Sequence, residues 1–285
     1  MKELLLPVAL FAILFGMGLS LRPADFLRVI LSPKAKLVGL GCQLVLLPVV
    51  AFILALAFRL PGELAVGLMV LAACPGGATS NVITHLARGD TALSVTVTAI
   101  SSVVCVFTIP WIIGISMDYF LGGAAAIRLP FWKTLAQLTA VTIVPIILGM
   151  ALKGAQPALA ARLARPANVF SLAFLAAIIV AAVLREDDLV HQFRVAGPAA
   201  ITLNILTMSL GFAVGSLFGL PQAQKITIAI EAGIQNGTLA LGISLGLLES
   251  ARIAMPSVVY CLFMFLTGGC MIARYGRRTP LRPVS

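Results

Sequence analysis

Charged residues are scarce in this sequence. Asp, Glu, Lys and Arg make up 11% of its 285 residues, and apolar residues make up 60%, whereas soluble domains contain about 25% charged residues. The mean hydropathy of +1.09 excludes an ordinary soluble domain. Long polar stretches are also missing, because the longest connections between apolar runs, 22–36 and 116–130, are too short for an independent domain of about 50 residues or more. Function must therefore reside in the apolar segments.

Motifs for disulfides, metals, nucleic acids and secretion are missing as well. The net charge is +10, but the 20 Lys and Arg residues form no basic stripe, so nucleic acid is not an expected partner. The apolar run at the N-terminus lacks a small-residue cleavage motif, so we expect a retained span rather than a signal peptide. The cysteines include no C-x-x-C pair, and we expect neither disulfides nor a cysteine metal site. They are Cys42, Cys74, Cys105, Cys261 and Cys270.

Apolar runs of about 18 or more residues, each long enough to cross a bilayer as a helix, recur along the whole chain. They predict an all-α polytopic membrane protein that has the lipid bilayer as its surroundings. The nine expected transmembrane helices are 4–21, 37–58, 64–87, 91–115, 131–152, 167–184, 195–219, 223–248 and 253–273.

The distribution of basic residues predicts an orientation. Of the Lys and Arg residues, 13 fall on the side of the C-terminus and 7 on the other side. By the positive-inside rule the basic tail, 274–285, is cytoplasmic and the N-terminus lies outside. Because the loops and the tail are short, we expect a bacterial inner membrane.

Two expected spans are interrupted at corresponding places, at CPGGATSN from Cys74 and at EAGIQNG from Glu231. Gly76 and Gln235 are 159 positions apart (235 − 76), and the same shift brings the starts of three further spans to within about four residues of the starts of their counterparts. The shift covers five spans, an odd number, so the second copy is inverted. The prediction is a first repeat of four spans, 1–115, that lacks a leading helix, and an inverted second repeat of five spans, 131–273. Inverted repeats with paired broken helices are typical of secondary transporters.

The predicted breaks contain the residues Pro75, Gly76, Gly77, Gly233 and Gly237. Proline removes a backbone donor and glycine weakens the helix, which frees carbonyls and amides inside the membrane. Such groups are tolerated in protein or around a cavity, where half-helix ends suit a cation or an anion. A simple proline kink is the alternative for either break alone.

Glu231 is the strongest single candidate, because a carboxylate inside the membrane costs at least about 2.5 to 3.5 kcal/mol unless it has a partner. A protonated, structural glutamate is the alternative. Nearby side-chain oxygens suit a hard cation such as sodium. These side chains belong to Gln43, Ser80, Asn81, Ser94, Thr98 and Gln235. Ser80 and Asn81 could instead cap the half-helix, and Ser94 and Thr98 could bond back to their own backbone. We expect His85 to be solvated and Asn204 to tie helices together.

The segments CPGGATSNVITHLARGD, ALSVTVT and EAGIQNGTLALGIS, with FGMGLSLRPADF before them and LPQAQKITIAIE between them, resemble the bile acid:sodium symporter family over nearly the whole chain. The resemblance implies an inverted-repeat transporter fold with a core domain, a panel domain and two crossing discontinuous helices. It further implies the nine-span form, which lacks the first helix of ten-span members.

The resemblance also implies two sodium ions and an organic anion. The first ion would be bound by Ser80, Asn81, Ser94, Thr98 and Glu231. The second would be bound by Gln43, Glu231, Gln235 and the carbonyls of Ala232 and Ile234. The anion would lie near Thr79 and Asn236, and would be a bile acid or a smaller acid such as pantothenate or a keto acid.

The sequence thus predicts a sodium-coupled symporter of an organic monoanion that operates by alternating access and is not an enzyme. A monomer contains both repeats and so suffices for function. One alternative is a proton-coupled carrier or a uniporter on the same fold. The other is an intramembrane hydrolase that uses a serine with His85.

Overall fold

The computed structural model describes residues 2–20, 33–122, 131–185 and 189–276, and every element within these ranges is a helix. The prediction of an all-α protein is therefore confirmed. The helices are α1 (Lys2–Ser20), α3 (Pro33–Gly41), η1 (Cys42–Leu46), α4 (Leu47–Ala57), α5 (Gly62–Ala73), α6 (Ala78–Leu86), α7 (Thr91–Phe120), α8 (Phe131–Ala155), α9 (Pro157–Arg185), α10 (Leu189–Leu217), α11 (Gln222–Gly233), α12 (Gly237–Gly242), η2 (Ile243–Leu247) and α13 (Ala251–Tyr275).

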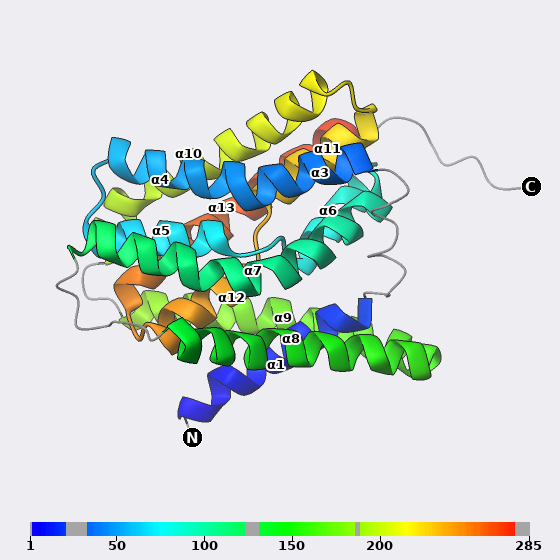
Figure 1. Ribbon diagram of the computed structural model, residues 1–285, viewed down its shortest axis with the longest axis horizontal. Coiled ribbons are helices and arrows are strands. Elements are labelled where there is room, and N and C mark those ends of the chain that lie inside the picture. The colour runs from blue at the N-terminus through cyan, green and yellow to red at the C-terminus, as the bar shows by residue number, and fades with distance from the viewer. Residues whose placement is uncertain (1, 21–32, 123–130, 186–188, 277–285) are drawn as a thin grey trace, which may run out of the picture.

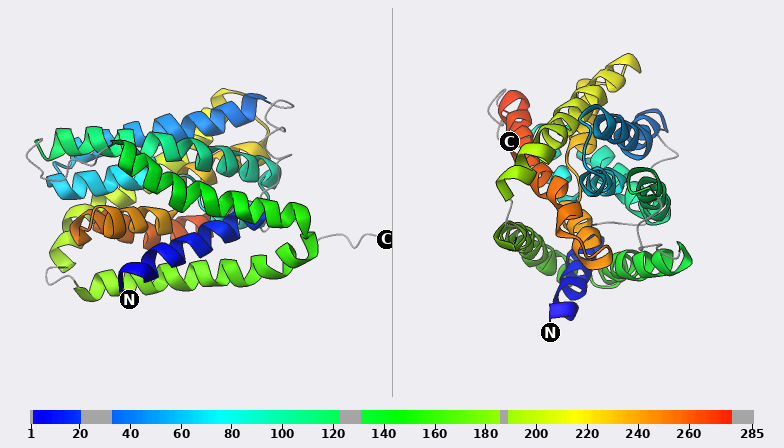
Figure 2. Two further views of the ribbon diagram at one scale, coloured as in Figure 1. Left: turned by 60° about the horizontal axis from the view of Figure 1, so that its bottom comes forward. Right: turned by 90° about the vertical axis from the view of Figure 1, so that its left-hand side faces the viewer.

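The helices form two groups (Figures 1 and 2). Helices α1, α8 and α9 pack on one another along one side of the molecule, and the remaining helices form a larger bundle beside them. Helix α1 also contacts α12, and α9 also contacts α12 and α13. The smaller group thus combines one helix from the first half of the chain with two from the second half.

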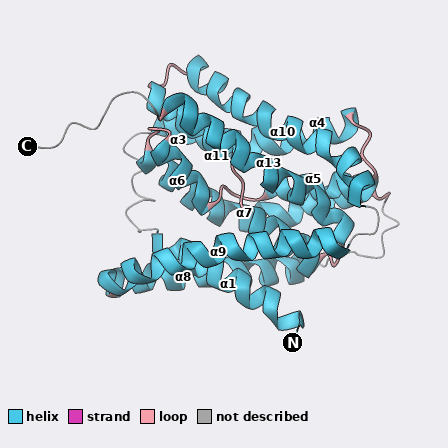
Figure 3. Cartoon of the chain, turned by 180° about the vertical axis from the view of Figure 1, so that it is seen from behind, coloured by secondary structure: helices cyan, strands magenta, loops and turns pink. Residues whose placement is uncertain are grey.

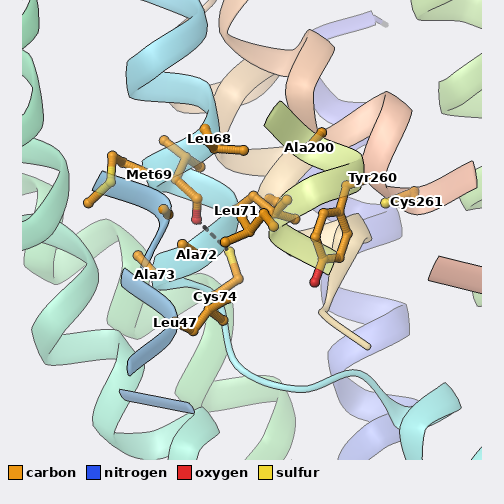
Figure 4. Packing of buried hydrophobic residues seen from close by; sticks show 14 of the residues in the cluster. Leu47, Leu68, Met69, Leu71, Ala72, Ala73, Cys74, Ala200, Tyr260 and Cys261 are labelled. Carbon is orange, nitrogen blue, oxygen red and sulfur yellow. Dashed lines mark hydrogen bonds between the residues drawn. The ribbon is translucent and has the colours of Figure 1, made fainter. Parts of the chain in front are cut away.

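Helix α5 lies in the middle of the larger bundle, packed against α4, α7 and α13. Its side chains are buried on every face, as expected for a helix surrounded by other helices. Figure 4 shows its residues between Leu47 of α4 on one side and Tyr260 of α13 on the other. This packing fixes the end of α5, at Cys74, in the centre of the molecule.

Both predicted helix interruptions are present (Figure 3). Helix α5 ends at Ala73, and Cys74 and Gly77 have extended backbones before α6 begins. Helix α11 ends at Gly233, and Ile234 is extended before α12 begins. Two further interruptions were not predicted. The segments Cys42–Leu46 and Ile243–Leu247 form π-helical turns, a rare feature that frequently occurs at functional sites.

Four helical segments are long and apolar enough to cross a membrane, among the residues that the structure describes. They are Pro33–Ala57, Thr91–Phe120, Val190–Leu217 and Ala251–Tyr275. The nine-span count, the inverted repeats and the orientation of the termini stay predictions.

One expected connection is wrong. Residues 153–166 are almost entirely helical, because α8 continues to Ala155 and α9 begins at Pro157. Proline fits the first turn of a helix, and the alanine and leucine residues that follow favour helix. The expected basic tail lies outside the described residues from position 277 onward.

Candidate functional site

The two helix breaks cross and are hydrogen-bonded to each other. Gly76 and Gln235 form an isolated antiparallel β-bridge, and they are the pair that the predicted register relates. The amide of Asn236 donates to the carbonyl of Pro75 at 2.9 Å, and the amide of Gly77 donates to the carbonyl of Ile234 at 3.4 Å. Backbone groups that the breaks free from one helix are therefore satisfied by the other break, which is a requirement inside a membrane.

Glu231 lies beside this crossing, near the end of α11, and is 1% exposed. Its Oε1 accepts from the hydroxyls of Ser80 at 2.6 Å and Ser94 at 2.5 Å, and its Oε2 accepts from the hydroxyl of Thr98 at 2.8 Å. Helices α6, α7 and α11 thus converge on one carboxylate. The hydroxyls of Ser94 and Thr98 bond to Glu231. The alternative, in which each hydroxyl bonds back to a carbonyl of its own helix, is not what the structure shows for these two residues.

Two of these hydroxyls also face a second acceptor. The Ser80 hydroxyl lies 2.7 Å from the carbonyl oxygen of Gly77, and the Ser94 hydroxyl lies 2.7 Å from Oδ1 of Asn81. Each hydroxyl carries one proton, so five oxygen–oxygen contacts share three protons. This excess of acceptors over donors favours an added positive charge, either a metal cation or a proton. Carboxylate, hydroxyl and amide oxygens are the ligands that hard cations prefer.

A second polar group lies next to the crossing, around the side chains of Gln43 and Gln235. Nε2 of Gln43 donates to Oε1 of Gln235 at 2.8 Å and to the carbonyl of Cys74 at 3.0 Å. Nε2 of Gln235 donates to the carbonyls of Ala232 at 3.0 Å and Glu231 at 3.3 Å. Gln43 is in the π-helical turn η1 and is 1% exposed. This group therefore contains Gln43, Gln235 and the Ala232 carbonyl, three of the predicted ligands, while the Ile234 carbonyl is used by the crossing.

Three side chains hold the end of α11 in place, and sequence reasoning missed two of them. The carbonyl of Gly233 accepts from Nδ2 of Asn204 at 2.7 Å and from the hydroxyl of Tyr260 at 3.0 Å. Oδ1 of Asn204 in turn accepts from the hydroxyl of Thr267 at 2.7 Å. Asn204 thus ties α10 to α11 and α13, as expected. Tyr260 and Thr267 carry no sequence signal that distinguishes them from ordinary polar residues of a span.

A cavity of about 360 Å³ opens next to the crossing, between the two groups of helices. The predicted anion residues Thr79 and Asn236 both line it. Oδ1 of Asn236 also accepts from the amide of Leu239 and so caps α12. The cavity wall is mostly apolar, and the N-terminus of α6 opens onto it, where the helix dipole favours negative charge. The lining residues are Ile13, Met17, Gly77, Ala78, Thr79, Val82, Ile83, Val169, Gln235, Asn236, Gly237, Thr238, Met264 and Phe265.

His85 lies away from this site. It occupies the last turn of α6, whereas the break lies at the start of that helix, and its side chain is exposed as expected. Groups of three or more His, Cys, Asp or Glu residues that could hold a metal are absent from the described part of the chain. Four of the cysteines are buried, while Cys270 is exposed on α13.

Comparison with known proteins identifies relatives of this chain. It is 32% identical over 264 residues to the uncharacterized sodium-dependent transporter YocS of Bacillus subtilis, which covers 92% of the chain and 80% of the relative. It is 28% identical over 282 residues to human sodium/bile acid cotransporter 4, which covers 94% of the chain and 62% of the relative. It is 26% identical over 286 residues to the probable chloroplastic sodium/metabolite cotransporter BASS1 of Arabidopsis thaliana, with coverages of 96% and 67%.

The relatives differ in length from this chain, which spans only 44% of the P3 proteins of mouse and human. A sequence profile of the sodium bile acid symporter family matches residues 7–193. This matched region contains the first helix break and the hydroxyls of α6 and α7, whereas Glu231 and the second break follow it. On this match, and on the 32% identity to YocS over 92% of the chain, the chain belongs to the sodium bile acid symporter family.

Proposed function

We propose that this chain is a sodium-coupled symporter that carries an organic monoanion across the membrane by alternating access. The family and the names of the relatives support a sodium-dependent transporter rather than an enzyme. The single observation that carries the coupling is the buried carboxylate of Glu231, which is surrounded by more oxygen acceptors than protons.

The first sodium ion binds, in this proposal, among Glu231, Ser80, Asn81, Ser94 and Thr98. A cation there balances the charge of the carboxylate. The hydroxyls of Ser80 and Ser94 then turn their single protons toward their second acceptors, the Gly77 carbonyl and Asn81 Oδ1. Because the ligands come from α6, α7 and α11, an ion at this position also holds these three helices together.

The second ion binds beside Gln43 and Gln235, whose amide oxygens and the nearby carbonyls of Ala232 and Ile234 supply neutral ligands. Two sodium ions and one monoanion carry a net charge of +1. The membrane potential then contributes about 2.3 kcal/mol per 100 mV to accumulation. Transport is therefore electrogenic in this proposal, and a monomer carries all the ligands.

The organic anion occupies the cavity of about 360 Å³ next to the crossing. This volume is near the lower end of the range of about 300 to 1,000 Å³ for ligand pockets. It favours a small acid with an apolar body over a bulky one. The carboxylate of the substrate lies toward Thr79, Asn236 and the N-terminus of α6, and its apolar part lies against the side chains of Met17 and Phe265.

Coupling between sodium and the organic anion follows because their two sites share residues. Residues Gly77, Gln235 and Asn236 belong both to the crossing and to the cavity wall. When sodium fixes the crossing, the anion meets a formed and electrically balanced site, and each ligand raises the affinity for the other. Helices α1, α8 and α9 then move against the larger bundle to change which side of the membrane the cavity faces.

A proton-coupled carrier is the second candidate function. A proton on Glu231 adds a fourth donor to the five oxygen–oxygen contacts and balances the charge without a metal ion. The two candidates differ in a simple way, since a proton-coupled carrier takes up its substrate in sodium-free buffer when a pH gradient is applied.

The test is the thermal stability of the purified protein in sodium chloride, with potassium or choline chloride at equal ionic strength as the control. A ligand that binds the folded state raises the unfolding temperature by mass action. We expect a rise specific to sodium that is absent in Glu231→Gln, followed by a further rise with some members of a panel of organic acids in sodium. A folded protein that shows no sodium-specific rise contradicts the proposal and favours the proton-coupled carrier.

A further inference from the structure

Helices α6, α7 and α11, which supply the side chains around Glu231, meet at a second junction one helical turn away. Helix α6 ends at Leu86, and a short turn leads to Asp90, which precedes α7. The side chain of Thr227 lies on α11 beside this turn and is fully buried. The proposed sodium and anion sites use neither Asp90 nor Thr227.

Thr227 connects α11 to the start of α7. The amide of Asp90 donates to the hydroxyl of Thr227 at 2.8 Å, and it lies 3.3 Å from the carbonyl of Ala223. The Thr227 hydroxyl in turn lies 2.9 Å from the carbonyl oxygen of Ala223 and 3.2 Å from the carbonyl oxygen of Asp90. Asp90 also caps α7, because its Oδ1 accepts from the amide of Leu93 at 3.0 Å. The Thr227 hydroxyl thus joins the N-terminus of one helix to the backbone of another.

The two junctions are in register. Thr227 and Glu231 are four residues apart on α11, and Asp90 and Ser94 are four residues apart at the start of α7, where the amide of Ser94 donates to the carbonyl of Asp90 at 3.0 Å. Residues four apart lie on one face of a helix, about 6 Å apart along its axis. The contact between Asp90 and Thr227 therefore joins α7 to α11 one helical turn before the contact between Ser94 and Glu231, on both helices.

The end of α6 is fixed at the same place. The amide of Gly89 donates to the carbonyl of Thr84 at 2.8 Å. A Cβ atom at Gly89 would lie 2.7 Å from Cγ2 of Thr84 and 2.8 Å from the hydroxyl oxygen of Thr227. These distances leave no room for a side chain between α6 and α11. The turn, the start of α7 and Thr227 therefore pack as one tight contact.

We propose that Thr227 is a positioning residue for the ion site, because its hydroxyl fixes the position of α7 along its axis relative to α11. This inference rests on the proposed sodium function of Glu231. A carboxylate and three hydroxyls bind an ion well only when they are held within about 0.5 Å of the required geometry. The junction at Thr227 holds the start of α7 so that Ser94 and Thr98 reach the two oxygens of Glu231.

The test compares Thr227→Val, which keeps the shape and removes the hydroxyl, with Thr227→Ser, which keeps the hydroxyl. The matched control is Thr96→Val, because the Thr96 hydroxyl is also buried but bonds to the carbonyl of Ala92 on its own helix. The probe is sodium alone. Two quantities are measured on purified protein: the unfolding temperature without sodium, and the sodium concentration that gives half of the sodium-induced rise.

We expect Thr227→Val to raise the half-saturating sodium concentration about three- to tenfold, the change that one lost hydrogen bond produces. Thr227→Ser and Thr96→Val should stay within about twofold of the unchanged protein. Gly89→Ala is a second route to the same result, since the added methyl group displaces the Thr227 hydroxyl without removing it. It should also raise the half-saturating concentration.

A Thr227→Val or Gly89→Ala protein that unfolds at a lower temperature without sodium, but keeps the same half-saturating concentration, contradicts the positioning role. Glu231→Gln separates this failure from a failure of the proposed function. If Glu231→Gln abolishes the sodium response while Thr227→Val leaves it unchanged, the ion site stands and only the role of Thr227 falls. If Glu231→Gln also leaves the response unchanged, the sodium site itself is wrong.

Discussion

Gly76 lies directly against Glu231. A Cβ atom on Gly76 would be 2.7 Å from Oε2 of Glu231 and 3.5 Å from the hydroxyl oxygen of Thr98. The first helix break and the buried carboxylate of the second half of the chain are thus in van der Waals contact, and only a glycine permits this approach.

Gly76→Ala is therefore expected to displace the carboxylate and to weaken sodium binding at least tenfold, because the added methyl group occupies the space next to Oε2. The matched control is Gly114→Ala on α7, where a Cβ atom would meet nothing within 4 Å beyond the backbone of its own helix and its chain neighbours. Sodium titration of the unfolding temperature distinguishes the two variants. An unchanged sodium response in Gly76→Ala would show that the ion does not bind at Oε2.

Ser94→Ala removes one hydroxyl from Oε1 of Glu231 and leaves Asn81 without its partner. A hydrogen bond to a charged group contributes about 1.5 to 3 kcal/mol, so we expect the half-saturating sodium concentration to rise about tenfold or more. Ser116→Ala is the control, since the buried hydroxyl of Ser116 bonds to the carbonyl of Ile112 on the same helix. Equal effects of the two substitutions would contradict a role of Ser94 in ion binding.

Thr79→Val keeps the shape of a cavity-lining side chain and removes its hydroxyl. We expect the stabilisation by sodium alone to be unchanged. The apparent affinity for an organic acid in the presence of sodium should fall about three- to tenfold. The same thermal assay measures both quantities. A loss of the sodium response would instead place Thr79 at the ion site, and an unchanged response to the acid would place the anion elsewhere.

Tyr260→Phe removes one of the two donors to the carbonyl of Gly233, while Asn204 still donates to it. Because the carbonyl stays paired, we expect a loss of only about 0.5 to 1.5 kcal/mol of stability. The unfolding temperature without sodium measures this loss. Tyr119→Phe, at a position where the side chain is exposed, is the control and should change nothing. A loss well above this range would contradict the expectation that Asn204 keeps the carbonyl of Gly233 paired.

The helix breaks could be predicted because their cause is local. Proline and glycine in an apolar run disturb the helix wherever the run lies, so Pro75, Gly76 and Gly77 identify the break without knowledge of the fold. Glu231 is similarly evident, since a carboxylate in an apolar run needs a partner. The hydroxyl side chains of Ser80, Ser94 and Thr98 could be proposed from composition, and the structure brings all three to Glu231.

The remaining parts of the site depend on which helices become neighbours. The hydroxyls of Tyr260 and Thr227 are ordinary polar groups in the sequence, and their roles appear only when α13 lies against the end of α11 and α7 lies beside its start. The π-helical turn at Gln43 has no proline or glycine within it. The start of α9 at Pro157 does not follow from hydropathy, because Arg162 and Arg165 interrupt the apolar run there and favour a connection over a span.

The crossing of the two breaks has a consequence for biosynthesis. Gly76 and Gln235 are 159 positions apart (235 − 76), and a chain is made and inserted from its N-terminus. During elongation, Ser80, Ser94 and Gln43 therefore enter the bilayer long before Glu231 and Gln235 leave the ribosome. The nascent first half must carry these polar groups without their final partners, and the hydrogen-bonded cluster around Glu231 is complete only when α11 has been inserted.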